Sequence, residues 1–176
     1  DVDVTTLAVD NTVANVAFTG NGSSVTNAVS FANDGTLTLG TSGGTQTYNG
    51  GLTTTSVGGT VTLNGEIETS NDAIVLGAVT LGSATTIDTD ASDTTGDITI
   101  GAVTGGSNSL TLSTGDNVAN TDISASGAIS GVTTLFLRST GGTATFSGDV
   151  DVTTLDINNT VANVAFTGNG SSVANS

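Results

Sequence analysis

Carboxylates are the only abundant side chains in this sequence that could do chemistry. The chain carries 16 Asp and Glu against a single basic residue, Arg138, and it has no His or Cys, so its net charge is −15. Without His and Cys, the chain cannot build a Ser–His or Cys–His nucleophile system. The acidic excess also argues against nucleic acid or an anionic membrane surface as a partner, because both need basic contacts.

The densest acidic stretch, DTDASDTTGD, contains Asp88, Asp90, Asp93 and Asp97. Alternating carboxylates among oxygen-rich neighbours are the ligand type that Ca²⁺ prefers, so these four residues are the candidate metal site. The stretch lacks the central Gly and the closing Glu of an EF-hand loop, and a solvated acidic corner is the alternative interpretation. No other cofactor is expected.

Three further pairs of acids would each lie on one face of a strand, where a cation could relieve their repulsion. These pairs are Asp1 and Asp3, Glu66 and Glu68, and Asp149 and Asp151. Two carboxylates are enough for glycoside hydrolysis. A near-identical repeat would duplicate any active site, however, and lyases of acidic sugars usually need more basic residues than Arg138. We therefore expect no enzyme activity.

The elements that must position these side chains are short strands. Segments of alternating apolar and polar residues recur along the chain, separated by Gly, Asn and Asp, at 3–9, 13–18, 35–40, 45–48, 59–65, 73–81, 97–103, 109–113, 132–139 and 143–148. Val, Leu and Ile alternate with Thr and Ser, a pattern typical of strands, and no window shows helical periodicity. The chain has 25 Gly and no Pro, and no apolar run approaches the ~18 residues of a membrane span. We predict an all-β chain without membrane insertion.

The beginning of the sequence recurs at its end. The segments 1–28 and 149–176 agree at 23 of 28 positions and differ only at 8/156, 9/157, 10/158, 26/174 and 28/176. Such self-similarity is the mark of a tandem array. It predicts one repeat unit over residues 1–148 and the start of the next unit over residues 149–176.

Apolar strand residues recur in three series with a mean spacing near 25 residues, for example Leu39, Leu63, Ile87, Leu112, Leu137 and Ile157. Three strands per turn of roughly this length describe a parallel β-helix, that is, a β-solenoid. On this interpretation the unit 1–148 makes about six turns, and residue 149 lies above residue 1 in the same register. A β-sandwich or jelly-roll subunit that polymerises by strand exchange is the alternative fold.

Two segments carry a resemblance to known families. The run GTLTLG…GGTQTYNGG (35–51) is similar to the strand repeats of autotransporter passenger domains. The run GDITIGAVTGGSNSLTLSTGDNVANTDISASGAISG (96–131) resembles the filamentous-haemagglutinin-type exoproteins of Gram-negative bacteria. The resemblance implies a parallel β-helix that is secreted to the cell surface and works as an adhesin, a fibre or a biofilm matrix component.

The leading functional prediction is a non-catalytic structural segment of an extracellular filament or adhesin stalk. Its expected partners are neighbouring repeats or further copies of itself. The alternative is an adhesive module that binds carbohydrate or another partner, such as a surface glycan, through Thr and Asn on one face. The triplets of the form Thr-x-Thr at 36–38, 45–47, 60–62 and 143–145 raise ice binding as a less favoured hypothesis, because they are unevenly spaced along the chain.

Overall fold

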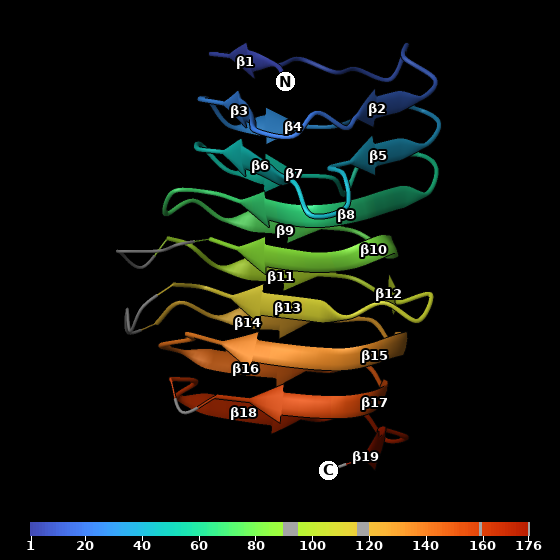
Figure 1. Ribbon diagram of the computed structural model, residues 1–176, viewed down its shortest axis with the longest axis vertical. Coiled ribbons are helices and arrows are strands. Elements are labelled where there is room, and N and C mark those ends of the chain that lie inside the picture. Colours follow the sequence, from blue (N-terminus) through green and yellow to red (C-terminus); the bar gives the residue numbers. More distant parts are fainter. Residues whose placement is uncertain (90–94, 116–119, 159, 176) are drawn as a thin grey trace.

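The chain winds into a stack of short parallel strands, with the first coil at one extremity and the last coil at the other (Figure 1). The computed structural model describes residues 1–89, 95–115, 120–158 and 160–175, which form strands and no helix. Every strand pair in this part of the chain is parallel. The predicted all-β solenoid is therefore confirmed, and the sandwich alternative is wrong.

Each full circuit of the chain, here called a coil, passes through three strand positions that we name face 1, face 2 and face 3. Face 2 is the seven-stranded sheet, made of β4 (Val29–Ser30), β7 (Leu52–Thr53), β9 (Ile74–Leu76), β11 (Ile98–Ile100), β14 (Ile123–Ala125), β16 (Thr143–Phe146) and β18 (Asn163–Phe166).

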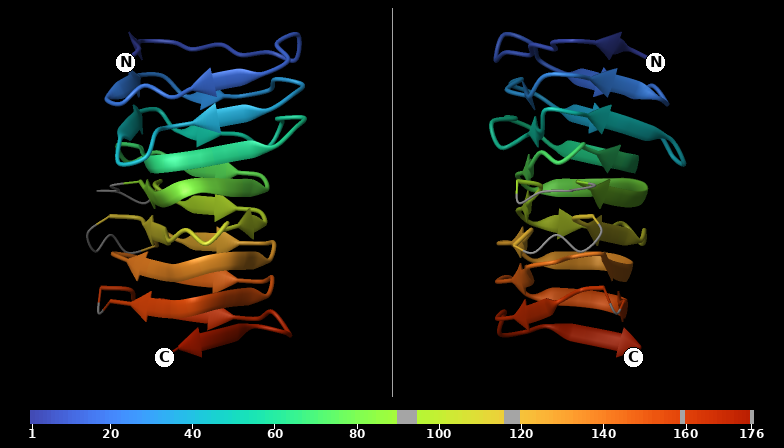
Figure 2. Two further views of the ribbon diagram at one scale, coloured as in Figure 1. Left: turned by 45° about the vertical axis from the view of Figure 1, so that its right-hand side comes forward. Right: turned by 90° about the vertical axis from the view of Figure 1, so that its left-hand side faces the viewer.

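Faces 3 and 1 share the twelve-stranded sheet, because four long strands run through the corner between them. These strands are β8 (Val61–Glu68), β10 (Val79–Asp88), β15 (Ile129–Arg138) and β17 (Val150–Ile157). Face 1 also holds β1 (Asp3–Val4), β3 (Ser23–Val25), β6 (Thr45–Tyr48) and β13 (Leu110–Ser113). Face 3 also holds β2 (Val16–Phe18), β5 (Leu37–Leu39), β12 (Val103–Thr104) and β19 (Ser172–Asn175). Figure 2 shows the same stack from two further sides.

One continuous apolar core runs along the inside of the coils. Alternation sends every second strand residue inward, as in β8, where buried and half-buried residues alternate over its whole length. The inward side chains of successive coils stack as ladders, for example Ile67, Ile87, Leu112 and Leu137 on face 1. All of these four are fully buried and belong to a single cluster that extends from Val25 to Val152. No coil could bury its apolar side alone, so the stack is the unit of stability.

Buried threonines close the corner between face 1 and face 2. Thr69, Thr89 and Thr114 each follow a face 1 strand at the same level of the register and are almost completely buried. The hydroxyls of Thr69 and Thr89 donate to the carbonyls of Asp72 and Gly96, and that of Thr114 contacts the hydroxyl of Thr121. Buried polar groups must be hydrogen-bonded, and here the buried hydroxyls find their partners in backbone carbonyls or in a second hydroxyl of the same corner.

The coils are shorter and less regular than the sequence spacing predicts. The shortest step between paired residues leads from Val61 to Val79, and the longest leads from Val103 to Ile129. The predicted series of Leu39, Leu63 and Ile87 is wrong at its last step, because Leu63 pairs with Leu81 on face 3 while Ile87 pairs with Ile67 on face 1. One long strand contributes apolar residues first to face 3 and then to face 1, so spacing alone does not tell the two faces apart.

The two copies of the repeated segment do not lie above one another. Stepping through paired residues on face 1, six coils lead from Asp3 to Arg138. Asp151, the repeat equivalent of Asp3, lies instead on face 3, six coils above Ala17. The shift between the copies is therefore six coils and two further faces, and the expected register of residue 149 above residue 1 is wrong.

Each copy nevertheless folds in the same local way. Asp3 pairs with Ser24 in the first copy and Asp151 pairs with Ser172 in the second, so equivalent residues are partners in both. The first copy passes through faces 1, 2 and 3 and returns to face 1, whereas the second passes through faces 3, 1 and 2 and returns to face 3. The local pairing belongs to the segment, and the coils between the copies decide which face it occupies.

Candidate functional site

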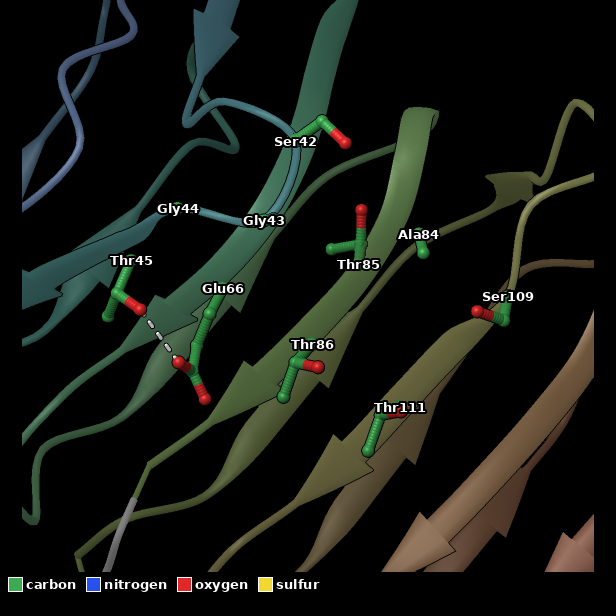
Figure 3. A pocket seen from close by; sticks show the side chains of 11 residues that line it. Ser42, Gly43, Gly44, Thr45, Glu66, Ala84, Thr85, Thr86, Ser109 and Thr111 are labelled. Atoms are coloured by element: carbon green, nitrogen blue, oxygen red, sulfur yellow. Dashed lines mark hydrogen bonds between the residues drawn. The ribbon is translucent and has the colours of Figure 1, made fainter.

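A shallow groove on the outer side of face 1 is a candidate site (Figure 3). It has a volume of about 410 Å³ and is lined by Ser42, Gly43, Gly44, Thr45, Gly65, Glu66, Ala84, Thr85, Thr86, Ser109 and Thr111. The paired column of Thr45, Glu66, Thr86 and Thr111 places these side chains on successive coils along the groove. Small residues at the adjoining corner, where β10 is shifted in register, leave the groove open.

The carboxylates on this face are held by hydroxyls of the preceding coil. The Thr45 hydroxyl donates to Glu66 Oε2 over 2.8 Å, and the Thr47 hydroxyl donates to Glu68 Oε1 over 2.6 Å. Among the described residues, Glu66 is the one carboxylate that lines the groove. Acid–base hydrolysis of a glycoside uses two carboxylates, so this lining does not provide the pair that such chemistry needs.

The four aspartates of the calcium prediction are divided between two faces and an undescribed stretch. Asp88 ends β10 on face 1, where it pairs in register with Glu68. Asp97 precedes β11 on face 2, and its Oδ1 accepts a hydrogen bond from the Asp122 amide over 2.8 Å. Asp90 and Asp93 lie outside the described residues. In the described part of the chain, no three acidic residues come together in a group that could hold a metal ion.

Asp97 belongs to a recurring device in which an Asp or Asn side chain binds the backbone of the following coil. Asp122 Oδ1 accepts from the Thr143 amide over 2.7 Å, and Asn15 Oδ1 accepts from the Thr36 amide over 2.9 Å. Asp3 and Asp149 accept in the same way from the amides of Ser24 and Gly170. These side chains connect neighbouring coils at the strand starts, which gives several of the predicted acidic pairs a structural role.

The difference between the two copies at position 10/158 shows that the charge of Asp10 is not needed for its own local turn. Hydrogen bonds from the Thr12 hydroxyl and amide lower the pKa of Asp10 below its ordinary value. In the second copy, Asn158 accepts the same two hydrogen bonds from Thr160. The oxygen acceptor is what the turn requires, and an amide supplies it as well as a carboxylate does.

Face 3 carries an uncharged row of hydroxyls that the uneven sequence spacing concealed. Thr38, Thr62, Thr80 and Thr104 pair in register on four successive coils. The triplets 36–38 and 60–62 therefore stack directly, whereas 45–47 lies on face 1 and 143–145 on face 2. A second shallow groove of about 420 Å³ crosses this face and is lined by Gly58, Gly59, Thr60, Ala78, Val79, Thr80, Ala102 and Thr104.

Sequence reasoning also missed a buried polar cluster beneath face 1. The Tyr48 hydroxyl donates to Gln46 Oε1 over 3.0 Å, and Gln46 Nε2 donates to the carbonyls of Phe18 and Gly20. Burial of Tyr48 raises the pKa of its hydroxyl far above its ordinary value. The alternation of TQTY predicts that Gln46 and Tyr48 share a side, and this was the available signal that a glutamine points inward.

Comparison with protein-family models, with curated proteins and with solved structures finds no match to this chain. The resemblance to bacterial exoproteins stays a prediction. Among the described residues, no helix has the length and hydropathy that would let it cross a membrane.

Proposed function

We propose that the chain is a non-catalytic structural segment of an extracellular filament or adhesin stalk. The observation that carries the proposal is the unbroken stack. Paired strands and one apolar cluster continue through the coils, and the repeated segment folds alike at both ends of the stack. Such a stack grows in length by adding coils, without any change to its core.

The rotation of the second copy relative to the first favours the same role. A stalk needs length and stiffness, and neither depends on which face a given segment occupies. One repeat unit adds six and two-thirds coils, or about 32 Å at the strand spacing of a sheet. Three units make twenty whole coils, so equivalent segments lie on the same face again after every third unit. A site confined to one face would point to a different side in each unit.

A surface location can be tested on the cells that produce the protein. Antibodies raised against this chain should label filaments or a matrix outside intact cells in immunogold electron microscopy. Preimmune serum and cells lacking the gene serve as controls. Label that appears only after the cells are permeabilised would contradict the proposed extracellular role.

Adhesion through face 3 to an uncharged glycan is a second candidate function. Between Thr36 and Ser130 the outward residues of this face are Thr, Ala and Ser without a charge, in a chain of net charge −15. Within the described structure, the hydroxyls of Thr62, Thr80 and Thr104 have no hydrogen-bond partner in the protein, unlike those of Thr45 and Thr47 on face 1. Free hydroxyls on a flat face are available to the hydroxyls of a polysaccharide.

The prediction for this second function is retention on an insoluble neutral polysaccharide such as cellulose or chitin. Thr62→Tyr and Thr80→Tyr should each lower retention roughly tenfold by breaking the flat surface. Thr99→Tyr, which places the same ring on face 2, is the matched control and should bind like the parent chain. Equal loss in all three variants would count against face 3, and capture by growing ice instead of glycans would favour the ice-binding alternative.

A further inference from the structure

The groove on face 1 combines a carboxylate of fixed position with hydroxyls that make no hydrogen bond to the protein. The Thr45 hydroxyl holds Glu66 through Oε2 over 2.8 Å. In the part of the chain that the structure describes, the other oxygen, Oε1, accepts no hydrogen bond, and the hydroxyls of Thr86 and Thr111 donate none. Figure 3 shows Glu66, Thr86 and Thr111 in a line that crosses three neighbouring strands.

The charge of Glu66 is not balanced by a basic side chain. The single basic residue of the chain, Arg138, lies three coils further along face 1 and forms its ion pair with Asp156 over 3.0 Å. The charged neighbours of Glu66 are acids, because Glu68 follows it in β8 and Asp88 pairs with Glu68. Several carboxylates therefore attract a cationic ligand to this groove and repel an anionic one.

The lining favours a sugar over the side chain of a basic protein. It consists of hydroxyls, glycine backbone and Glu66, and its one wholly apolar residue is Ala84. The methylene stem of a Lys or Arg would need a larger apolar wall. A sugar presents hydroxyls along its length, as this lining does. The volume of about 410 Å³ lies within the range of about 300 to 1,000 Å³ that is typical of small-ligand sites.

We propose that the groove on face 1 binds a glycan whose sugars carry a free amino group, with an ammonium at Glu66 and sugar hydroxyls at Thr86 and Thr111. The proposal goes beyond the structural role of the stack. It also differs from adhesion through face 3, because the ligand is cationic and the surface is another one.

The spacing of the groups sets the direction of the ligand. Thr86 lies one coil and Thr111 two coils from Glu66, which is a row about 10 Å long at the strand spacing of a sheet. The glycan therefore runs along the axis of the stack, across the strands. An ammonium at Glu66 Oε1 forms a charge-assisted hydrogen bond, which is stronger than a neutral one. Thr45 already fixes the carboxylate, so little side-chain entropy is lost on binding.

Calorimetric titration of the intact chain with a tetramer of glucosamine, at mildly acidic pH where its amines are protonated, tests the site. Glu66→Gln should lower the affinity roughly tenfold, because a charged hydrogen bond is lost. The variant keeps an oxygen for the Thr45 hydroxyl, so its thermal unfolding should match that of the parent chain.

Glu68→Gln is the matched control. Glu68 lies on the same strand and is held by the Thr47 hydroxyl in the same way, but it does not line the groove. Its replacement removes the same charge and should change the affinity by no more than about twofold, because salt screens the more distant charge. Equal losses in the two variants would show a general attraction between opposite charges and would overturn the proposed site.

The role of the hydroxyls is tested with a variant that keeps every charge. Thr111→Val removes one hydroxyl and should lower the affinity roughly threefold. Thr99→Val, which makes the same change on face 2, should bind like the parent chain. Full affinity in the Thr111→Val protein would contradict the proposed row of contacts.

Two further probes identify the ligand. The N-acetylated tetramer has the same sugar chain without the charges and should bind at least about tenfold more weakly. Tetralysine has ammonium groups without sugar hydroxyls and should also bind more weakly. If tetralysine binds as tightly as the amino sugar and depends equally on Glu66, the groove fits a basic protein segment and the proposal is wrong. None of these results bears on the location of the protein or on face 3, so the proposed function is tested separately.

Discussion

Replacement of Gly40 by Ala is expected to destabilise the protein by at least about 3 kcal/mol, among the largest effects of any single methyl group. Gly40 follows β5 at the corner that leads from face 3 to face 1, and its φ angle is +73°. A Cβ atom at this position would overlap the carbonyl oxygen of Asn64 in the next coil, far inside van der Waals contact. The clash is with backbone, which cannot move away without breaking the stacking of two coils.

Gly43 provides a matched control close by in the same corner. Its φ angle is +70°, almost the same as that of Gly40, but a Cβ atom there would meet no other atom within 4 Å. Gly43→Ala should therefore lower the free energy of unfolding only by the strain of a left-handed backbone conformation, about 1 to 2 kcal/mol. The difference between the two variants isolates the close approach of neighbouring coils.

Urea unfolding followed by circular dichroism measures both variants, and hydrogen exchange locates the effect. In the Gly40→Ala protein, the amides of Leu37 and Leu63 should lose protection before those of Leu112 and Leu137, because a stack can open from one end. Equal stabilities of the two variants would show that neighbouring coils are not in contact at Gly40.

Alkaline destabilisation through Tyr48 is the second large effect that we expect. The chain has one Tyr and no Lys or Cys, so Tyr48 is the one side chain whose ordinary pKa falls between pH 9 and pH 12. Its burial raises the pKa of the hydroxyl in the folded protein. Below pH 10 the Tyr48 hydroxyl is protonated in both the folded and the unfolded protein, so the free energy of unfolding keeps its full value. Above pH 10 the unfolded chain releases the proton while the folded chain keeps it, so the free energy of unfolding falls.

The expected slope is about 1.4 kcal/mol for each pH unit above 10, the value for one proton. Urea midpoints at pH 8, 10, 11 and 12 measure it, and absorbance at the tyrosinate band shows whether the folded protein retains the proton. Tyr48→Phe should be less stable at neutral pH, by about 1 to 3 kcal/mol, because Gln46 Oε1 loses its donor. The same variant should show no slope above pH 10. Ordinary ionisation of Tyr48 near pH 10 in the folded protein would contradict the buried environment.

The candidate functional residues could be predicted only in part from the sequence. The acidic stretch from Asp88 to Asp97 forms one predicted site because its members are close in the chain. In the fold, Asp88 ends a strand on face 1 and Asp97 precedes one on face 2, so a corner separates their side chains. In contrast, Thr38, Thr62, Thr80 and Thr104 are far apart in the chain and form one row. The unequal coil lengths hid that row.

Residue pattern alone was enough to predict the all-β class, the parallel coil with three strand positions, and the inward and outward sides of most strands. These properties are local, because alternation within a strand and the composition of its corners suffice to specify them. The pairing of each copy of the repeated segment with itself is local in the same sense, since Asp3 with Ser24 and Asp151 with Ser172 are equivalent pairs.

The face that each segment occupies, by contrast, became known only from the complete fold. The face of a segment depends on the summed lengths of all the coils before it. These lengths vary, from the short step between Val61 and Val79 to the long step between Val103 and Ile129. A small irregularity in one coil therefore moves every later residue. The repeat consequently places Asp3 on face 1 and Asp151 on face 3. Register in a stacked coil is a cumulative property of the whole chain, and no short segment contains it.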